Sequence, residues 1–251
     1  MRVIERAEVA RRLTYEACIP IVRQAMIDFS SGSTRQLLRS IIPLADGRLF
    51  GIMPGALSET AAFGAKLISV YPENFLRGRQ SHQGLVVLFE PETGEPVCIV
   101  HAGEITAIRT AAASAVATDA LARVDASRLA ILGYGEQAAT HARALLQVRQ
   151  IRAVRVWGRS PDRAVAFCRQ MSAELGIPFA NAAAVEGAVD DADIICTVTG
   201  AREPILKGAW VRRRAADEIT VYKSLGHIVQ DLASAWALFQ GLPDFRVGCQ
   251  R

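Results

Sequence analysis

The feature that most constrains this chain is an apolar segment that runs directly into a glycine-rich turn and then a helix. In LAILGYGEQAATHARALL the turn holds Gly133, Gly135 and Ala138 at the spacing G-x-G-x-x-A. An alanine-rich helical pattern follows, and after it come the strand-like VRVWGRS, a helical pattern over 161–175 and the apolar DIICTVTG. Strands that alternate with helices usually pair in parallel. The middle of the chain is therefore predicted to form a doubly wound α/β sheet.

The same turn predicts a nucleotide site in a Rossmann-like domain. The first glycine makes the tight turn, the second lets the backbone approach a pyrophosphate, and the helix N-terminus attracts the anion. The second strand ends at Gly158-Arg159-Ser160, where NAD sites commonly carry an acidic residue. Arg159 and Ser160 suit a 2′-phosphate, which favours NADP(H), with NAD(H) as the alternative. In the other interpretation Arg159 is a surface residue and Asp162 contacts the ribose.

The residues before this domain predict a layer of helices and strands. A short helix is expected around 6–13 and a longer one in YEACIPIVRQAMIDFSSG, which has one apolar stripe. RSIIPL, RLFGIMPG and GAKLISVYP have strand character, and LVVLFEPETGEPVCIV is a hairpin with a Pro-Glu-Thr-Gly turn. The sheet is expected to be antiparallel or mixed. A small-residue helix is expected over Thr106–Arg123.

After GAWV at 208–211 the pattern changes abruptly. Arg212, Arg213 and Arg214 mark a join, EITVYKS is expected to be a strand, and a terminal helix carries Ile228, Leu232, Trp236 and Phe239 on one face. The predicted fold is α/β, with an apparently truncated Rossmann-like nucleotide-binding domain over 120–211. Residues 1–119 together with 212–251 are predicted to form an α+β domain for substrate binding and dimerisation.

Composition excludes several classes of protein. The chain has 251 residues, of which 51% are hydrophobic and 22% charged, and its net charge of +4 comes from scattered residues apart from the three adjacent arginines. No nucleic-acid partner is expected. The five cysteines form no CxxC pair, so we expect reduced thiols and no metal site. No signal peptide or membrane-spanning segment is evident, which favours a cytoplasmic protein with no membrane partner.

Motifs along nearly the whole chain resemble the ornithine cyclodeaminase/mu-crystallin family. In chain order they are MPG (53–55), GAKL, SHQG (81–84), EITAIRTAAASA, LGYGEQA, TVTGAREPIL and EITVYKSLG. The resemblance implies NAD(P)-dependent hydride transfer at the α-carbon of a basic amino acid or cyclic imine. The reaction would be conversion of ornithine to proline and ammonia, reduction of a ketimine, or an amino-acid dehydrogenase reaction. It also implies a homodimer built through the first domain. The substrate and the direction of reaction stay open.

The resemblance also implies the site residues. The substrate carboxylate would be held by basic side chains, with Lys66 also catalytic, and the substrate set is Arg39, Lys66, Arg109 and Leu225. The cofactor set is Ser81, Arg109, Gly133, Gly135, Glu136, Gln137, Arg159, Ser160, Thr199 and Ser224. Without the family, Lys66 would be an outward strand lysine and Arg109 would pair with Glu104. Ser81 would be a turn residue, Thr199 a strand end and Ser224 a helix cap.

A block of the family pattern has no counterpart here. Family members continue past the GAWV region with a Pro-Gly turn, a strand of HVNAVG type and a catalytic acidic residue, whereas Val211 here leads into the three arginines. Only about four strands are expected from Leu129 onward, where a complete doubly wound domain has six. DIICTVTG would then lie at the sheet edge. The alternative function is therefore a catalytically impaired NADP(H)- and small-ligand-binding protein of mu-crystallin type, unless Glu104, Glu136 or Asp217 replaces the acid.

Overall fold

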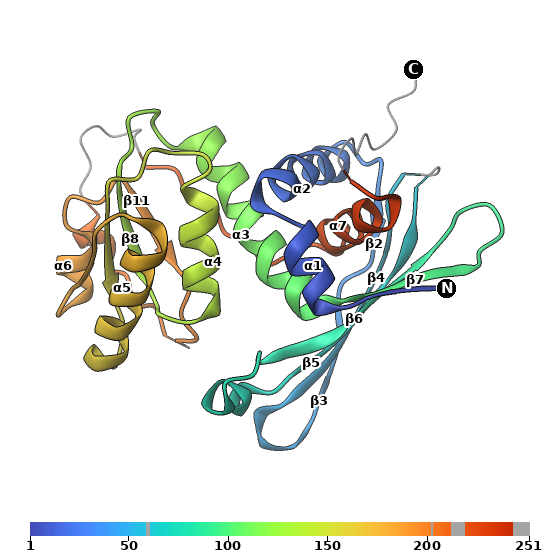
Figure 1. Ribbon diagram of the computed structural model, residues 1–251, viewed down its shortest axis with the longest axis horizontal. Coiled ribbons are helices and arrows are strands. Elements are labelled where there is room, and N and C mark those ends of the chain that lie inside the picture. The colour runs from blue at the N-terminus through green and yellow to red at the C-terminus, as the bar shows by residue number, and fades with distance from the viewer. Residues whose placement is uncertain (59–60, 202, 212–218, 243–251) are drawn as a thin grey trace. The chain divides into compact units, whose positions relative to one another are not determined.

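The structure is a computed structural model that describes residues 1–58, 61–201, 203–211 and 219–242. It divides into two compact units (Figure 1). Unit 1 comprises Met1–Ala113 together with the chain from Leu225, and unit 2 comprises Ser114–Ser224. Arg212, Arg213, Arg214 and Asp217 lie outside the described residues. In the part of the chain that is described, no helix is long and apolar enough to cross a membrane.

Unit 1 contains a mixed seven-stranded sheet in the order β1-β7-β6-β5-β4-β2, with β3 also paired to β4. Among its described strands, β1 and β7 pair in parallel and the other pairs are antiparallel, which confirms a mixed sheet. The strands are β1 (Arg2–Ile4), β2 (Arg35–Gln36), β3 (Ser40–Pro43), β4 (Leu49–Ala56), β5 (Phe63–Val70), β6 (His82–Phe89) and β7 (Pro96–His101).

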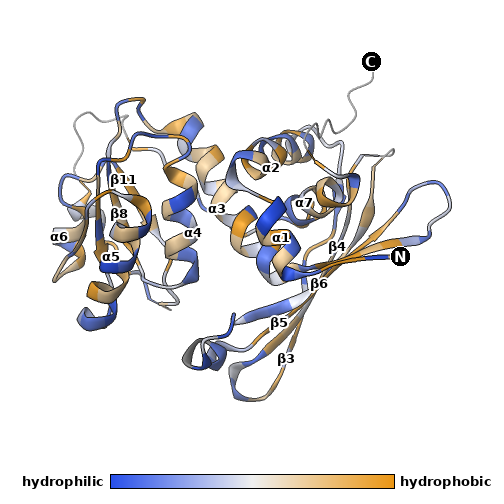
Figure 2. Cartoon of the chain, in the orientation of Figure 1, coloured by the Kyte–Doolittle hydropathy of each residue, from blue (hydrophilic) through white to orange (hydrophobic). Residues whose placement is uncertain are grey.

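The two faces of this sheet differ in exposure because alternate strand residues point to opposite faces. Lys66 and Ile68 on β5 and Val86 on β6 are buried on the inner face. On the outer face, Phe63 stacks on Phe89 with ring centroids 5.3 Å apart. Figure 2 shows apolar residues along much of this sheet. Its outer face, here called the outer apolar face, includes exposed Val3, Ile42, Phe63 and Leu85.

The α-helices in the described part of unit 1 are α1 (Arg6–Arg12), α2 (Tyr15–Ser30), the first part of α3 (Ala102–Leu121), and α7 (Ile228–Gln240). The hydroxyl of Thr14 caps α2 by accepting a hydrogen bond from the backbone N–H of Ala17 at 3.3 Å. Helix α7 packs against α2 and strands β4, β5 and β6. Nearly the whole surface of α7 is buried, including three polar residues, so the expected single apolar face underestimates its burial.

Unit 2 contains a parallel sheet in the order β10-β9-β8-β11. Its strands are β8 (Arg128–Leu132), β9 (Ala153–Trp157), β10 (Phe179–Asn181) and β11 (Ile194–Thr197), and its helices include α4 (Glu136–Leu145), α5 (Pro161–Leu175) and α6 (Val185–Val189). Numbered along the chain, these strands lie in the order 3-2-1-4, which is the first part of the Rossmann arrangement. Among the described residues β11 is an edge strand, as expected.

The strand expected at EITVYKS is wrong for its described part. Ile219–Ser224 have no regular secondary structure, and Val221 is 82% exposed. The branched and aromatic residues of this segment have a preference for strands, but a strand also needs a partner whose backbone groups it can bond. None of the described strands pairs with this segment.

Candidate functional site

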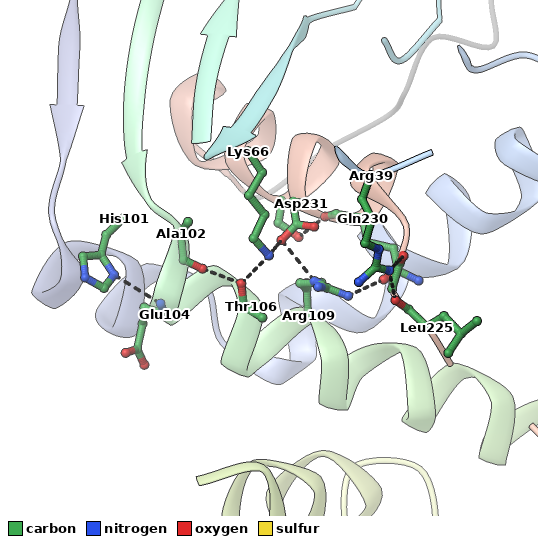
Figure 3. A network of polar contacts seen from close by, with 12 residues as sticks. Arg39, Lys66, His101, Ala102, Glu104, Thr106, Arg109, Leu225, Gln230 and Asp231 are labelled. Atoms are coloured by element: carbon green, nitrogen blue, oxygen red, sulfur yellow. Dashed lines mark hydrogen bonds and ion pairs between the residues drawn. The ribbon is translucent and has the colours of Figure 1, made fainter. Parts of the chain in front are cut away.

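Lys66 lies in the middle of β5, opposite Met53 on β4, and its side chain is only 2% exposed. Its Nζ donates hydrogen bonds to Thr106 Oγ1 at 2.5 Å and to Asp231 Oδ1 at 2.9 Å (Figure 3). The Thr106 hydroxyl in turn donates to the carbonyl oxygen of Ala102 at 2.6 Å. Lys66 is therefore an inward-facing lysine, and the interpretation as an outward strand residue is wrong.

Arg109 projects from α3 toward the same carboxylate and is also buried. Its Nε donates to Asp231 Oδ1 at 3.1 Å and its Nη1 to Gln230 Oε1 at 2.7 Å. The alternative pairing of Arg109 with Glu104 is wrong, because Glu104 accepts hydrogen bonds from Arg6 and Gln80 instead. Positions five apart on a helix do not share a face, so Glu104 and Arg109 point in different directions.

Asp231 joins the two cations, although sequence reasoning did not single it out. It lies on α7, is 0% exposed, and accepts from both Lys66 and Arg109 through Oδ1. Its second oxygen, Oδ2, is buried with no hydrogen-bond partner among the described residues. Figure 3 shows the cluster assembled from β5, α3 and α7. We call Lys66, Arg109 and Asp231 the buried cluster.

The buried cluster carries two cationic side chains and one carboxylate. Burial lowers the pKa of Lys66 from 10.5 to about 8, with Asp231 opposing this fall and Arg109 adding to it. Burial alone would raise the pKa of Asp231, but Arg109 and Lys66 together hold it below its ordinary value. Asp231 is therefore ionised at neutral pH, and the cluster has an excess of positive charge that a second anion would balance.

Arg39, which precedes β3, is a third cation and contacts the loop that leads into α7. Its Nη2 donates to the carbonyl oxygens of Leu225 and of Gly226, the latter at 3.2 Å. Gly226 has a φ of +73°, and a Cβ there would lie 3.0 Å from Arg109 Nη1. His227 follows, and its Nδ1 lies 2.9 Å from Gln36 Nε2. The structure thus brings Arg39, Leu225 and Arg109 close together, with a glycine where a side chain would crowd the guanidinium.

The candidate nucleotide residues of unit 2 surround the first strand-to-helix turn. Gly133 follows β8 with a φ of +134°, and a Cβ there would lie 2.6 Å from the carbonyl oxygen of Val198. Gly135 is the N-cap of α4, and Glu136 and Gln137 form its first turn. A glycine turn, a helix N-terminus and a parallel strand in this arrangement fit a dinucleotide pyrophosphate.

The remaining predicted residues lie at ends of elements. Arg159 is exposed after β9, and Ser160 is the N-cap of α5 without a side-chain capping bond. Thr199 follows β11, and its hydroxyl accepts from the backbone N–H of Ala201 at 3.2 Å. Ser224 closes unit 2. Ser81 lies in unit 1 immediately before β6, and its Oγ is 2.9 Å from His82 Nδ1.

No group of three or more metal-binding side chains occurs within the described ranges. The buried cluster and the glycine turn are the two candidate binding sites described above. One suits a carboxylate and the other a nucleotide.

Comparison with known proteins identifies relatives along most of the chain. The profile of the ornithine cyclodeaminase/mu-crystallin family matches residues 1–213. The Δ(1)-pyrroline-2-carboxylate reductase of Bacillus cereus is 35% identical over 206 residues, which is 82% of this chain and 63% of that protein. The ketimine reductase mu-crystallin of Rattus norvegicus is 35% identical over 198 residues, or 77% of this chain and 62% of that protein.

A solved structure is also similar. The Δ(1)-pyrroline-2-carboxylate reductase of Thermococcus litoralis, in complex with NADH and L-proline, superposes with a TM-score of 0.80 at 34% identity. The match covers 84% of this chain and 66% of that one. The chain thus spans less than two thirds of the length of these relatives.

Proposed function

Because this chain belongs to the ornithine cyclodeaminase/mu-crystallin family, we propose that it binds a nicotinamide nucleotide and a small cyclic imino acid and reduces the C=N bond. In this proposal, unit 1 binds the carboxylate of the imino acid and unit 2 binds the nucleotide. Conversion of ornithine to proline and ammonia, in which the hydride is first removed from the α-carbon and then returned to the cyclic imine, is the other reaction open to such a site. The reductive direction is favoured by the names of the relatives, which are a pyrroline-2-carboxylate reductase and a ketimine reductase.

The observation that carries this proposal is the unbalanced charge of the buried cluster. Lys66 and Arg109 share one carboxylate oxygen of Asp231, and Arg39 donates to the carbonyl oxygen of Gly226, a residue that lies against Arg109. An α-carboxylate would supply the missing negative charge and accept hydrogen bonds from the cations. Each charge-assisted hydrogen bond of this kind contributes about 1.5–3 kcal/mol.

Lys66 is proposed to be the catalytic proton donor. When bound, a reduced nicotinamide nucleotide supplies a hydride to the imine carbon. The imine nitrogen then needs one proton to complete the amine, and Lys66 Nζ can supply it. A proton donor works best when its pKa lies near the working pH, and burial brings the pKa of Lys66 to about 8. The proton that Lys66 loses would be regained from solvent before the next turnover.

We propose NADP(H) as the preferred nucleotide, with NAD(H) as the alternative. Arg159 is exposed directly after β9, at the place where Rossmann domains contact the adenosine ribose, and Ser160 begins α5 with no capping bond from its hydroxyl. The Thermococcus litoralis relative holds NADH. Fluorescence titration with NADPH and NADH tests the preference: Arg159→Ala should weaken NADPH binding and leave NADH binding unchanged. Equal weakening of both would contradict it.

A second candidate function is nucleotide and ligand binding without turnover. The expected counterpart of the family's catalytic acid is missing after Val211, where the sequence continues with Arg212. The two functions separate in a single pair of assays. Loss of reduced-nicotinamide absorbance with Δ(1)-pyrroline-2-carboxylate reports reduction, and nucleotide fluorescence reports binding. Consumption favours reduction, binding without consumption favours the second function, and absence of binding would refute both.

Two variants test the assigned roles. Arg109→Met should raise the KM for the imino acid by about 10–100-fold, because it removes charge-assisted bonds to the carboxylate. Lys66→Met should lower kcat by about 10²–10⁴-fold if it removes the proton donor. Arg143→Lys is the matched control, since Arg143 pairs with Glu174 on the surface of unit 2. An unchanged kcat in Lys66→Met would remove Lys66 from the catalytic role.

We also propose a homodimer formed through the outer apolar face of unit 1. Val3, Ile42, Phe63 and Leu85 expose 37–58% of their surface on this face, and large apolar patches commonly mark interfaces. Light scattering after gel filtration should give a dimer, and Leu85→Arg should give a monomer. The control is Val124→Arg, which changes a 91% exposed residue of unit 2. A monomeric unmodified chain would contradict the proposal.

A further inference from the structure

We propose that Asp231 is a positioning residue, which holds Lys66 and Arg109 so that their remaining N–H donors serve one carboxylate ligand. The inference rests on the proposed function for the identity of that ligand. It assigns a role to a residue that is not among the predicted site residues. Asp231 is an anion within the buried cluster itself, and it therefore holds the two cations in place before a ligand binds.

The hydrogen-bond inventory supports this assignment. A lysine ammonium has three N–H donors, and Lys66 uses two of them on Asp231 and Thr106. An arginine guanidinium has five, and Arg109 uses one on Asp231 and one on Gln230. Among the described residues, this leaves one donor on Lys66 and three on Arg109. A carboxylate ligand can accept those of Arg109, and the one on Lys66 can face both the carboxylate and the imine nitrogen, which are bonded to the same α-carbon.

Helix α7, which carries Asp231, is held in place by hydrogen bonds of its other buried polar residues. Gln230, the residue before Asp231 on α7, accepts a hydrogen bond from Arg109 and donates one to Met26 Sδ at 3.1 Å. Ser234, one turn later, donates to the backbone oxygen of Gln230 at 2.8 Å. Gln230, Asp231 and Ser234 are each 0% exposed. The burial and the contacts of α7 fix the position of the Asp231 backbone, from which Oδ1 can orient the two cationic partners.

Removing the carboxylate changes the charge environment of Lys66 in a definite direction. The titratable and charged groups around the cluster are Arg39, His82, Arg109, His227, Asp231 and Cys18. Of these, Asp231 is the carboxylate that favours the charged form of Lys66, whereas Arg109 and Arg39 disfavour it. Without Asp231, Lys66 should lose its proton at a lower pH, and the carboxylate ligand should lose one of its cations.

The composition of the chain makes the direct measurement simple. The sequence contains three lysines, Lys66, Lys207 and Lys223. Protein labelled with ¹³C at the lysine ε-carbon therefore gives three signals, which Lys207→Arg and Lys223→Arg assign. In the unmodified chain the Lys66 signal should titrate near pH 8. In Asp231→Asn its midpoint should fall by about one pH unit or more.

Two further variants keep the measurement decisive. Asp193→Asn is the control, because Asp193 is a poorly exposed carboxylate with arginine partners in unit 2. It should leave the Lys66 midpoint unchanged. If Asp231→Asn does not fold, the double variant Arg109→Met/Asp231→Asn retains the net charge of the cluster. Its Lys66 midpoint should still lie below that of the unmodified chain, because Asp231 affects Lys66 more strongly than Arg109 does.

Ligand binding supplies the second measurement, with pyrrole-2-carboxylate as a planar probe in calorimetry. At pH 7.5 Asp231→Asn should bind it about tenfold more weakly or worse, and the deficit should narrow at pH 6 as Lys66 regains its proton. A Lys66 midpoint that does not move in the Asp231 variants would overturn the inference. Failure of the unmodified chain to bind the probe, with a midpoint that does move, would instead count against the proposed function.

Discussion

Replacing Lys66 by methionine should destabilise the fold much less than replacing Asp231 by asparagine, although the two side chains form one ion pair. The buried cluster has two positive charges and one negative charge. Lys66→Met leaves Arg109 and Asp231 as a neutral pair. Asp231→Asn leaves two cations with no anion between them. The two variants therefore move the buried net charge in opposite directions.

The sizes of the two effects follow from the burial of each group. Breaking a buried ion pair by removing one partner typically costs about 3–5 kcal/mol, and Asp231→Asn should fall in this range. The pKa of Lys66 is lowered from 10.5 to about 8, and this fall of 2.5 units corresponds to about 3 kcal/mol against its charged form. This value already includes the attraction of Asp231, so methionine removes the net penalty, which offsets the lost hydrogen bond to Thr106. Lys66→Met should therefore lie within about 2 kcal/mol of the unmodified chain.

Urea unfolding at pH 7 measures both values. Trp236 lies in α7 of unit 1, and Trp157→Phe/Trp210→Phe leaves it as the single tryptophan that reports on this unit. The free energy of unfolding should fall clearly for Asp231→Asn and only slightly for Lys66→Met. Equal losses, or a larger loss for Lys66→Met, would refute the view that the cluster carries excess positive charge.

Three further outcomes are expected. Because the folded pKa of Lys66 is lowered, the unfolded chain binds more protons between pH 8 and 10.5, so the unfolding free energy of the unmodified chain relative to Lys66→Met should rise by about 3 kcal/mol across this window. A flat difference would contradict the shift. Gly226→Ala, with its φ of +73° and its Cβ near Arg109, should weaken calorimetric binding of pyrrole-2-carboxylate about tenfold, whereas Gly208→Ala should not; unchanged binding would release Gly226 from the site. Thr14→Ala should lower the unfolding free energy of unit 1 by about 1 kcal/mol through loss of the α2 cap, and no change would mean that the cap contributes little.

Local patterns were enough to predict the elements whose stability depends on their own sequence. Helix α5 begins at Pro161 and ends at Leu175, as its proline and following glycine indicate. The glycine turn before α4 could also be predicted from the local sequence, because the spacing of its two glycines and its alanine is enough to identify it. EITVYKS shows the limit of this reasoning, since its residues favour a strand but the described structure offers it no partner.

Asp231 could not be predicted as part of the site because its role depends on tertiary packing. It is one of four polar residues, with Gln230, Ser234 and Gln240, in a helix that otherwise consists of apolar and small residues. A weak signal exists, since a helix that is apolar on all sides is usually buried, and a carboxylate within it then needs cationic partners. Lys66 and Arg109 supply them from positions 165 and 122 residues earlier in the chain.

The dependence of the buried cluster on α7 sets an order for folding during synthesis. Unit 2 is one continuous stretch, Ser114–Ser224, whereas unit 1 uses residues from both sides of it. Ribosomes deliver the chain from the N-terminus, and domains fold as their residues emerge. Unit 2 can therefore fold while unit 1 still lacks a helix. Until residues 228–240 have been made, Lys66 and Arg109 have no carboxylate between them. The ability to bind the imino acid should therefore appear only when unit 1 has finished folding.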